Sequence, residues 1–234
     1  MKGAYLLQLG QVPYVEAWDL QRRLAAGVLE GTLPDTLLFL EHPPVVTLGR
    51  RTDEGELHLP EGAQVEIVET DRGGKSTFHG PGQLVCYPIL DLKRHGRDVK
   101  RYVRDLEETL VRTVAPFGLE GQRLEGLTGV WLTRPPRKIA SIGVHISRWV
   151  TTHGYALNVD LDPAPFTEWI TACGLEDAAF TSLARETGAA VSVDEVRPHA
   201  VDALAAVFGL VFDELPGHEP GLWAQPLHAQ LSAR

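Results

Sequence analysis

A glycine-rich stretch near the middle of the chain carries the first residue types that could bind a ligand. It runs from Asp71 to Gln83 and holds four glycines. Because glycine lacks a Cβ and accepts positive φ, such a stretch lets backbone N–H groups approach carbonyl or anionic oxygens. Glycines alone would indicate a long turn between strands. Arg72, Lys75 and His79 lie among them and make a binding site the preferred interpretation.

A cysteine and a lysine later in the chain are the candidates for covalent chemistry. Cys173 precedes Gly174 at the expected end of a short helix, and Lys138 begins a strand after a Pro-Pro turn. A cation lowers the pKa of a nearby thiol from about 8.5, so the pair could supply a thiolate nucleophile and a carrier for its proton. From spacing alone, a buried thiol and a solvated lysine remain the commoner alternatives.

The other thiol and the histidines give no sign of a metal or cofactor. Cys86 lies inside the apolar run 84–90 and is expected to be an inert core thiol. Two cysteines without Cys-x-x-Cys spacing give no zinc signature, and the histidines lack metal-ligand spacing. His79 and His153 each precede a glycine, which is typical of turn residues whose imidazoles hydrogen-bond locally. No cofactor and no metal are therefore expected.

The pattern of apolar residues predicts an α/β (α+β) protein with a mixed, largely antiparallel sheet flanked by helices. Several predicted strands are joined too tightly for the crossovers that parallel neighbours need. Strands are expected at 4–9, 36–40, 45–48, 65–69, 84–90, 129–132, 138–146 and 152–160, the last two as an antiparallel pair. Helices are expected at 14–29, from Asp98 to about 118, at 163–170 and at 193–208.

Length and charge restrict the class of protein. No linker-like segment divides the 234 residues before about Pro163, so we expect one catalytic domain over 1–234 with room for a small C-terminal lobe from about 163 to 215. A net charge of -9 argues against a general nucleic-acid partner. No apolar run approaches the roughly 20 residues that span a bilayer, and no signal peptide is evident, so no membrane partner and a cytoplasmic location are expected.

Six short motifs occur along the chain in the same order as in a known protein family. They are RGGKSTFHGPGQL at 72–84, YPILDL at 87–92, KIASIG at 138–143, HGYALNV at 153–159, CG at 173–174 and TSL at 181–183. Together they resemble the signature of the lipoyl(octanoyl) transferase family, over a range from about Glu41 to Leu183. The His-Gly-Pro-Gly-Gln segment followed by the later lysine and cysteine is the most specific part of the match.

The resemblance implies an enzyme that transfers an octanoyl group from octanoyl-acyl carrier protein to a lysine of a lipoyl domain, without ATP. The family's thioester-forming cysteine and its acid/base lysine match Cys173 and Lys138 by position. The implied acceptors are the lipoyl domains of 2-oxoacid dehydrogenase complexes and the glycine cleavage H protein. The implied fold is that of biotin and lipoate protein ligases. The implied substrate-binding residues are Arg72, Gly73, Gly74, Lys75, Ser76, Thr77, Phe78, His79, Ser141, Ile142, Gly143, Gly154, Tyr155 and Ala156.

Two positions depart from the family pattern. Lys75 stands where glutamine is usual, and Ala172 precedes the cysteine where proline is common. Neither change removes a group that the reaction needs, and the sequence does not define what the added cation of Lys75 does. Because carrier proteins of this kind are acidic, the loop arginines Arg50 and Arg51, with Arg94 and Arg97, are candidates for docking the donor.

Two other functions fit parts of the same sequence. An ATP-dependent lipoate or biotin protein ligase would share the fold, but it would need a nucleotide site and no catalytic cysteine. A non-catalytic module that binds lipoyl domains or carrier proteins would make Cys173 dispensable. The glycine-rich stretch together with Cys173 favours the transferase over both.

Overall fold

A mixed sheet of nine strands lies at the centre of the computed structural model, which describes residues 2–171 and 179–215. Its strands are β1 (Lys2–Gln11), β2 (Asp35–Glu41), β6 (Gln83–Ile89), β7 (Gln122–Leu124), β8 (Leu127–Thr133), β9 (Pro136–Ser147), β10 (Val150–Asn158), β11 (Ala179–Phe180) and β12 (Leu210–Leu215). They follow the order β12-β1-β2-β6-β10-β9-β8-β7, with β11 beside β9. Only the pairs β12/β1, β1/β2 and β11/β9 of this sheet are parallel, which confirms the largely antiparallel prediction.

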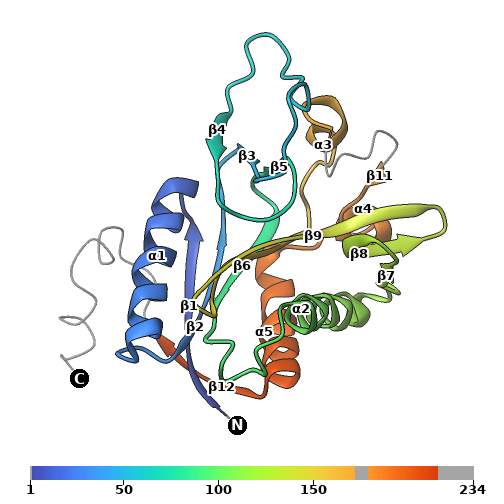
Figure 1. Cartoon of the computed structure of the whole chain (residues 1–234). Coiled ribbons are helices and arrows are strands. Elements are labelled where there is room, and N and C mark those ends of the chain that lie inside the picture. Colours follow the sequence, from blue (N-terminus) through green and yellow to red (C-terminus); the bar gives the residue numbers. More distant parts are fainter. Residues whose placement is uncertain (1, 172–178, 216–234) are drawn as a thin grey trace.

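Helices cover both faces of this sheet (Figure 1). Helix α1 (Tyr14–Glu30) packs on one face, and α2 (Val99–Val114) and α5 (Val193–Phe208) pack together on the other. The alternation of side chains along β6 serves both cores. Leu84 and Cys86 join the cluster under α2 and α5, whereas Val85 and Tyr87 join the cluster under α1. The apolar run that predicted this strand is therefore explained by burial on both faces.

The ends of the long helices follow the predicted signals. Gly31 adopts the left-handed conformation after α1, with φ of 76°. The Asp98 side chain accepts a hydrogen bond from the N–H of Arg101 at the start of α2. Ser192 and Glu195 form a capping box at the start of α5. The shorter helices are the 3-10 turn Ala115–Phe117, α3 (Pro165–Glu168) and α4 (Leu183–Thr187).

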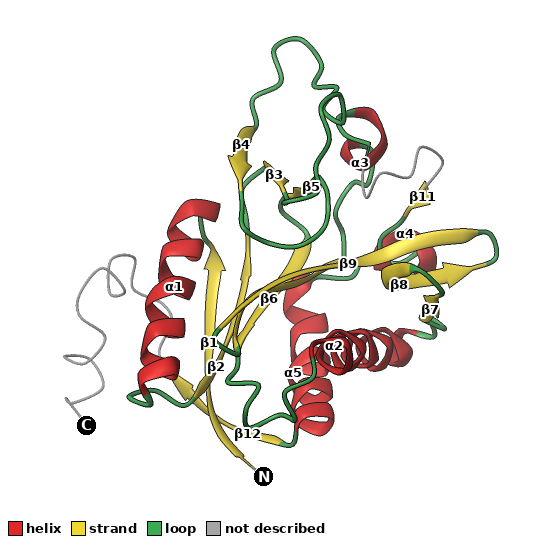
Figure 2. Cartoon of the chain, in the orientation of Figure 1, coloured by secondary structure: helices red, strands yellow, loops and turns green. Residues whose placement is uncertain are grey.

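A small second sheet sits at one end of the large one (Figure 2). It consists of β3 (Val45–Leu48), β4 (Glu66–Glu69) and β5 (Thr77–His79), in the order β4-β3-β5. The glycine-rich stretch is therefore not a turn between two neighbouring strands, as one interpretation held. It leaves the small sheet at β4, contributes β5 to that sheet, and then enters the large sheet at β6.

The β9–β10 hairpin is antiparallel, as predicted, but its turn is tighter than the segment 147–151 suggested. Only Arg148 and Trp149 separate the strands, and both have positive φ, of 50° and 71°. Such values at both central residues are typical of a two-residue type I′ hairpin turn, whose twist matches that of the strands. No helix within the described ranges is long and apolar enough to cross a membrane.

Candidate active site

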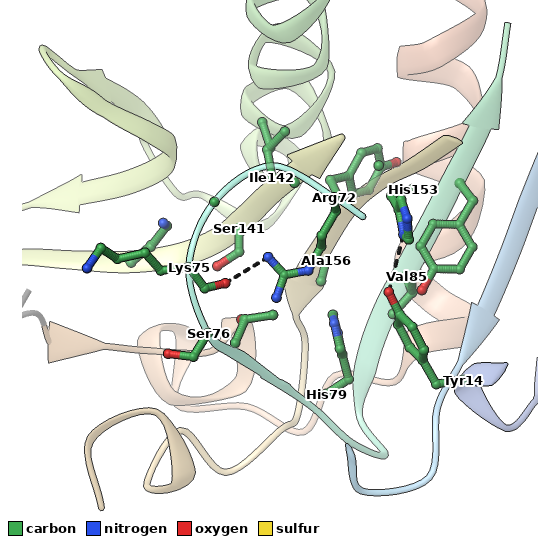
Figure 3. Close-up of a pocket in the computed structure, with 17 residues that line it drawn as sticks. Tyr14, Arg72, Lys75, Ser76, His79, Val85, Ser141, Ile142, His153 and Ala156 are labelled. Atoms are coloured by element: carbon green, nitrogen blue, oxygen red, sulfur yellow. Dashed lines mark hydrogen bonds between the residues drawn. The ribbon is translucent and has the colours of Figure 1, made fainter. Parts of the chain in front are cut away.

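A cavity, here called the main cavity, lies where the glycine-rich stretch covers the β9–β10 hairpin (Figure 3). Most of the predicted substrate-binding residues line it, together with the candidate acid/base residue Lys138. They are Arg72, Gly74, Lys75, Ser76, Thr77, His79, Ser141, Ile142, Gly143, Gly154, Tyr155 and Ala156. Two predicted residues lie elsewhere: Gly73 lines an adjoining hollow, and Phe78 packs edge-on against Phe166 and Trp169.

Arg72 shapes the wall of the main cavity through contacts with backbone and hydroxyl groups. Its side chain is buried, and Nη2 donates to the backbone oxygen and to Oγ1 of Thr47, each at 2.7 Å. Nη1 donates to the backbone oxygen of Lys75 at 2.8 Å. Because the guanidinium spreads its donors over β3 and the glycine-rich stretch, it holds the stretch against the small sheet.

Close backbone approach explains two of the predicted glycines. A Cβ at Gly154 would lie 2.2 Å from the backbone oxygen of Cys86, so β10 can pack against β6 at this point only without a side chain. A Cβ at Gly143, opposite Gly154 in the hairpin, would lie 3.1 Å from Cδ of Arg72. Glycine therefore leaves the space that the arginine stem fills.

Lys75 forms ion pairs with Asp53 and Glu56. The hydrogen bonds that Lys75 donates to these two carboxylates raise the pKa of Lys75 and lower the pKa of Asp53. The Glu56 side chain is buried and also accepts a hydrogen bond from Ser76 at 3.1 Å. The residue that departs from the family pattern thus ties the 49–56 loop to the glycine-rich stretch.

The side of the main cavity away from Lys75 and Ser141 is formed by a hydrogen-bonded aromatic group (Figure 3). The Nε2–H of His153 donates to Asp71 at 2.7 Å, and its Nδ1 accepts from the Tyr14 hydroxyl at 3.2 Å. Burial lowers the pKa of His153 and raises that of Tyr14 to about 12, so both rings are neutral at pH 7. His153 has φ of 56° within a strand, a strained conformation held by these contacts.

A second chain of hydrogen bonds connects the cavity with Thr181, the residue that follows β11. His79 Nδ1–H donates to Gln83 Oε1 at 2.7 Å, Gln83 donates to Asn158 at 2.9 Å, and Asn158 donates to the backbone oxygen of Thr181 at 2.9 Å. Burial holds the pKa of His79 well below its ordinary value. His79 and His153 both lie in strands rather than turns, and the bonds of His153 are long-range rather than local as first interpreted.

Lys138 reaches the main cavity because β9 contains a bulge. The register shifts between the pairs Val130–Ala140 and Trp131–Lys138, which leaves Ile139 as the extra residue and reverses the face on which the lysine lies. Its Nζ lies 5.4 Å from the centre of the Trp131 ring. The side chain is buried, with 4% of its surface exposed.

Cys173, the predicted nucleophile, lies outside the described residues, as does Ala172. The chain on either side is described. Before the gap, Thr171 donates from its N–H to the backbone oxygen of Glu56 at 2.8 Å, next to the glycine-rich stretch. After the gap, Phe180 pairs with Lys138 in the parallel β11/β9 ladder. The described residues on the two sides of the gap therefore lie beside the glycine-rich stretch and beside Lys138.

Cys86 is fully buried in the core below α2 and α5, and burial raises the pKa of its thiol well above the ordinary value. This agrees with the expected inert thiol. No group of three or more His, Cys, Asp or Glu in the described ranges is placed to hold a metal ion.

Four lining residues were not identified from the sequence: Tyr14, Val85, Tyr87 and His153. The first follows Pro13 at the start of α1, where helical periodicity marks it only as a core position. Val85 is indistinguishable from other apolar residues of a buried strand. The YPILDL motif includes Tyr87 and the HGYALNV motif includes His153, so those motifs were usable signals for these two residues.

The sequence is similar to characterised families over most of its length. The model of the lipoyl protein ligase A/B catalytic domain matches residues 13–205. An octanoyltransferase of Mycobacterium tuberculosis is 52% identical over 215 residues, which cover 90% of this chain and 91% of that protein. An octanoyltransferase of Chloroflexus aurantiacus is 49% identical over 208 residues, which cover 86% of this chain and 92% of that protein.

Solved structures share the fold at low sequence identity. A bipartite lipoate protein ligase from Thermoplasma acidophilum has a TM-score of 0.72 and 16% identity, over 96% of this chain and 90% of that chain. A biotin protein ligase from Aquifex aeolicus has a TM-score of 0.57 and 15% identity, over 88% of this chain and 70% of that chain. These matches confirm the predicted biotin/lipoate ligase-like fold.

Proposed function

Because this chain belongs to the lipoyl protein ligase A/B catalytic domain family and is an octanoyltransferase of protein lipoylation, we propose that it acts through a cysteine thioester with octanoyl-acyl carrier protein as donor. The observation that supports this mechanism is the main cavity, where Lys138 lies beside apolar lining residues and its strand β9 pairs with β11, which follows Cys173 in the sequence. The acceptors are the lysines of lipoyl domains in 2-oxoacid dehydrogenase complexes and of the glycine cleavage H protein. The place of action is the cytoplasm.

In the first half-reaction, the thiolate of Cys173 attacks the thioester carbonyl of the donor. A new carbon–sulfur bond forms, the old one breaks, and the thiolate of the carrier leaves with a proton from the ammonium of Lys138. One thioester replaces another, so the step is nearly balanced in free energy and needs no ATP. Before this step, the neighbouring ammonium stabilises the Cys173 thiolate.

In the second half-reaction, the neutral amine of the acceptor lysine attacks the acyl-enzyme. An amide bond forms, the carbon–sulfur bond breaks, and Cys173 leaves as a thiolate. Lys138, now a neutral amine, takes the proton that the acceptor nitrogen loses, which restores the starting pair. Backbone N–H groups of the glycine-rich stretch are the candidate donors to the oxyanion in both halves.

The octanoyl chain lies in the main cavity. Val85, Ile142 and Ala156 supply apolar contacts from β6, β9 and β10, and each buried CH₂ contributes about 0.8 kcal/mol of binding free energy. Lys75 does not compete as a general base, since its ion pairs with Asp53 and Glu56 keep its amine protonated. The cavity thus combines an apolar slot with the lysine at the thioester.

A transfer assay without nucleotide tests the proposed function. The protein is mixed with octanoyl-acyl carrier protein and an unmodified lipoyl domain, and the mass of the lipoyl domain is followed. We expect one octanoyl group on the domain, at a rate that added ATP does not change. A requirement for ATP with free octanoate would instead identify a ligase, and binding of the domain without transfer would identify a non-catalytic module.

A further inference from the structure

A second hollow, here called the side hollow, adjoins the main cavity and has no role in the proposed mechanism. Its volume is about 380 Å³, within the usual range for a small-molecule site. The two spaces share wall residues, namely Gly74, Lys75, Lys138, Ile142 and Gly143. A ligand in the main cavity can therefore continue into the side hollow where the two meet at Lys138.

The walls of the side hollow offer three kinds of contact. Val103 of α2, Leu127 of β8 and Val144 of β9 form an apolar side. Trp131 also lines the hollow, and its buried indole N–H has no hydrogen-bond partner in the part of the chain that the structure describes. Arg51 adds an exposed cation, which the bond from its backbone N–H to Gly74 holds beside the glycine-rich stretch.

The unpartnered indole N–H is the informative feature. A buried donor without an acceptor is costly, and such groups are rare unless a ligand or water completes them. Because the nitrogen is closed off from solvent, a carbonyl oxygen bound in the side hollow would satisfy it once the indole ring turns slightly toward the hollow. The occupant should therefore carry an acceptor such as an amide, an apolar portion for the aliphatic wall, and an anion for Arg51.

We propose that the side hollow binds the thiol-bearing arm of the donor, an extended chain of amide groups that ends in a phosphodiester. This inference rests on the proposed function. In a thioester, the acyl chain and the arm lie on opposite sides of the reacting carbonyl. With the acyl chain in the main cavity and the carbonyl at Lys138, the arm continues into the side hollow, where Trp131 donates to an amide carbonyl and Arg51 pairs with the phosphate.

The acceptor substrate fits these walls less well. The acceptor lysine is an aliphatic stem with a terminal amine whose lone pair is used in the attack on the thioester, so the stem leaves no acceptor for the Trp131 N–H and no anion for Arg51. The other cation of the rim, Lys75, already pairs with two carboxylates. Charge and hydrogen-bonding capacity therefore favour the donor arm over the acceptor.

A series of small donors separates the parts of the arm. The octanoyl thioesters of ethanethiol, pantetheine and 4′-phosphopantetheine add first the amides and then the phosphate. Acylation of the protein is measured by stopped-flow release of the thiol, and kcat/KM is compared across the series. We expect kcat/KM to rise at each addition in the unaltered protein.

Arg51→Glu tests the phosphate contact. We expect it to remove the advantage of 4′-phosphopantetheine over pantetheine, a factor of roughly three to five for a partly exposed ion pair, and to leave the ethanethiol thioester unchanged. Arg50→Glu is the matched control, since Arg50 is a neighbouring exposed arginine that does not line the side hollow. Equal effects of the two reversals would overturn the assignment of the phosphate to Arg51.

Trp131→Phe tests the amide contact, because phenylalanine keeps an aromatic face for Lys138 and lacks the N–H. We expect a roughly three- to tenfold loss for the pantetheine thioester and little change for the ethanethiol thioester. Thr128→Trp should block the arm by filling the side hollow from an exposed wall position, and Thr133→Trp at the other end of β8 is its control.

The outcomes distinguish this inference from the proposed function. If the ethanethiol thioester acylates the protein but pantetheine and phosphate bring no gain, the side hollow does not bind the arm and the transferase mechanism stands. If Arg51→Glu and Thr128→Trp instead raise only the KM of the lipoyl domain, the hollow serves the acceptor and the inference is wrong. If no thioester acylates the protein, the proposed function itself fails.

Discussion

Tyr14 is predicted to set the length of the acyl chain that the main cavity accepts. Its ring is 1% exposed and stacks on His79 at 5.8 Å between centroids, and its hydroxyl bonds His153. His153 pairs with Val144 in the hairpin, three residues beyond Ser141, which places the two ends of the cavity roughly 10 Å apart along the strands. Tyr14 and His153 lie together on the side of the cavity away from Ser141 (Figure 3), so we predict that an acyl chain entering beside Ser141 ends against this pair.

Replacing Tyr14 with leucine should open space for about two further methylene groups. At about 0.8 kcal/mol per buried CH₂, the gain for decanoyl over octanoyl is about 1.6 kcal/mol, or roughly 15-fold in the ratio of their kcat/KM values. Tyr14→Phe is the control, because it removes only the hydroxyl. It should leave the chain-length ratio unchanged while it lowers the free energy of unfolding by about 1–3 kcal/mol, since the Nδ1 of His153 loses its donor.

The assay compares hexanoyl, octanoyl, decanoyl and dodecanoyl thioesters of N-acetylcysteamine in the three proteins, with thermal unfolding as a check of folding. We expect the optimum of Tyr14→Leu to move to longer chains and that of Tyr14→Phe to stay at octanoyl. If a folded Tyr14→Leu protein keeps the original ratio, the chain does not end at Tyr14 and the orientation argued for the cavity is wrong.

Three further predictions concern a glycine beside Lys138, the ion pair of Lys75 and the buried His42. Gly129→Ala should slow acylation at least tenfold, because its Cβ would lie 2.5 Å from the backbone oxygen of Ala140 and 2.8 Å from Cε of Lys138 at a backbone φ of 117°, and would displace the lysine together with its strand. Gly126→Ala, whose Cβ meets no atom, should cost only backbone strain in a parallel acylation assay. Lys75→Met should lower the midpoint of urea unfolding, since it leaves the buried carboxylate of Glu56 without its partly exposed cation. Burial lowers the pKa of His42 to about 4, below the value of about 6.5 in the unfolded chain. The contribution of neutral His42 to the free energy of unfolding is therefore complete above pH 6.5, and about 3 kcal/mol of it is lost as the pH falls to 4. His42→Gln should make the free energy of unfolding in urea less dependent on pH between 6.5 and 4.

The sequence predicted the elements whose signals are local. The capped helices α2 and α5 and the β9–β10 hairpin carry periodicity and end signals within their own segments, and each was found close to its predicted bounds. The strand β5 was not predicted, because three residues inside a glycine-rich stretch show no alternation. Its pairing with β3 depends on contacts between distant segments.

The predictions for the candidate site differ in the same way: residues in local motifs were identified, and residues placed by long-range packing were not. Motif residues such as Arg72 and Ser141 come together in the main cavity because the motifs themselves lie on facing strands and loops. Tyr14 could not be identified, since its position in the wall depends on how α1 packs on the sheet. The orientation of Lys138 depends on a one-residue bulge, and a period of two would have placed it on the same face as Ala140.

The expected roles of Lys75 and the docking arginines change once the structure is known. Lys75 is a structural cation rather than an unexplained one. Arg94 pairs with Asp35 at 3.0 Å, and both it and Arg97 follow β6 at the end away from the glycine-rich stretch. Of the four arginines predicted to dock the donor, Arg50 and Arg51 are the two that lie beside the glycine-rich stretch, so the proposed docking of an acidic carrier is expected to depend on their loop.

The intact mass of the protein after incubation with octanoyl-acyl carrier protein tests the central claim most directly. We predict one added octanoyl group in the unaltered protein and in Cys86→Ser, because Cys86 is buried away from the main cavity. The same incubation should leave the mass of Cys173→Ser unchanged. An octanoyl adduct that persists in Cys173→Ser, or transfer to the lipoyl domain by that variant at the original rate, would contradict the cysteine thioester.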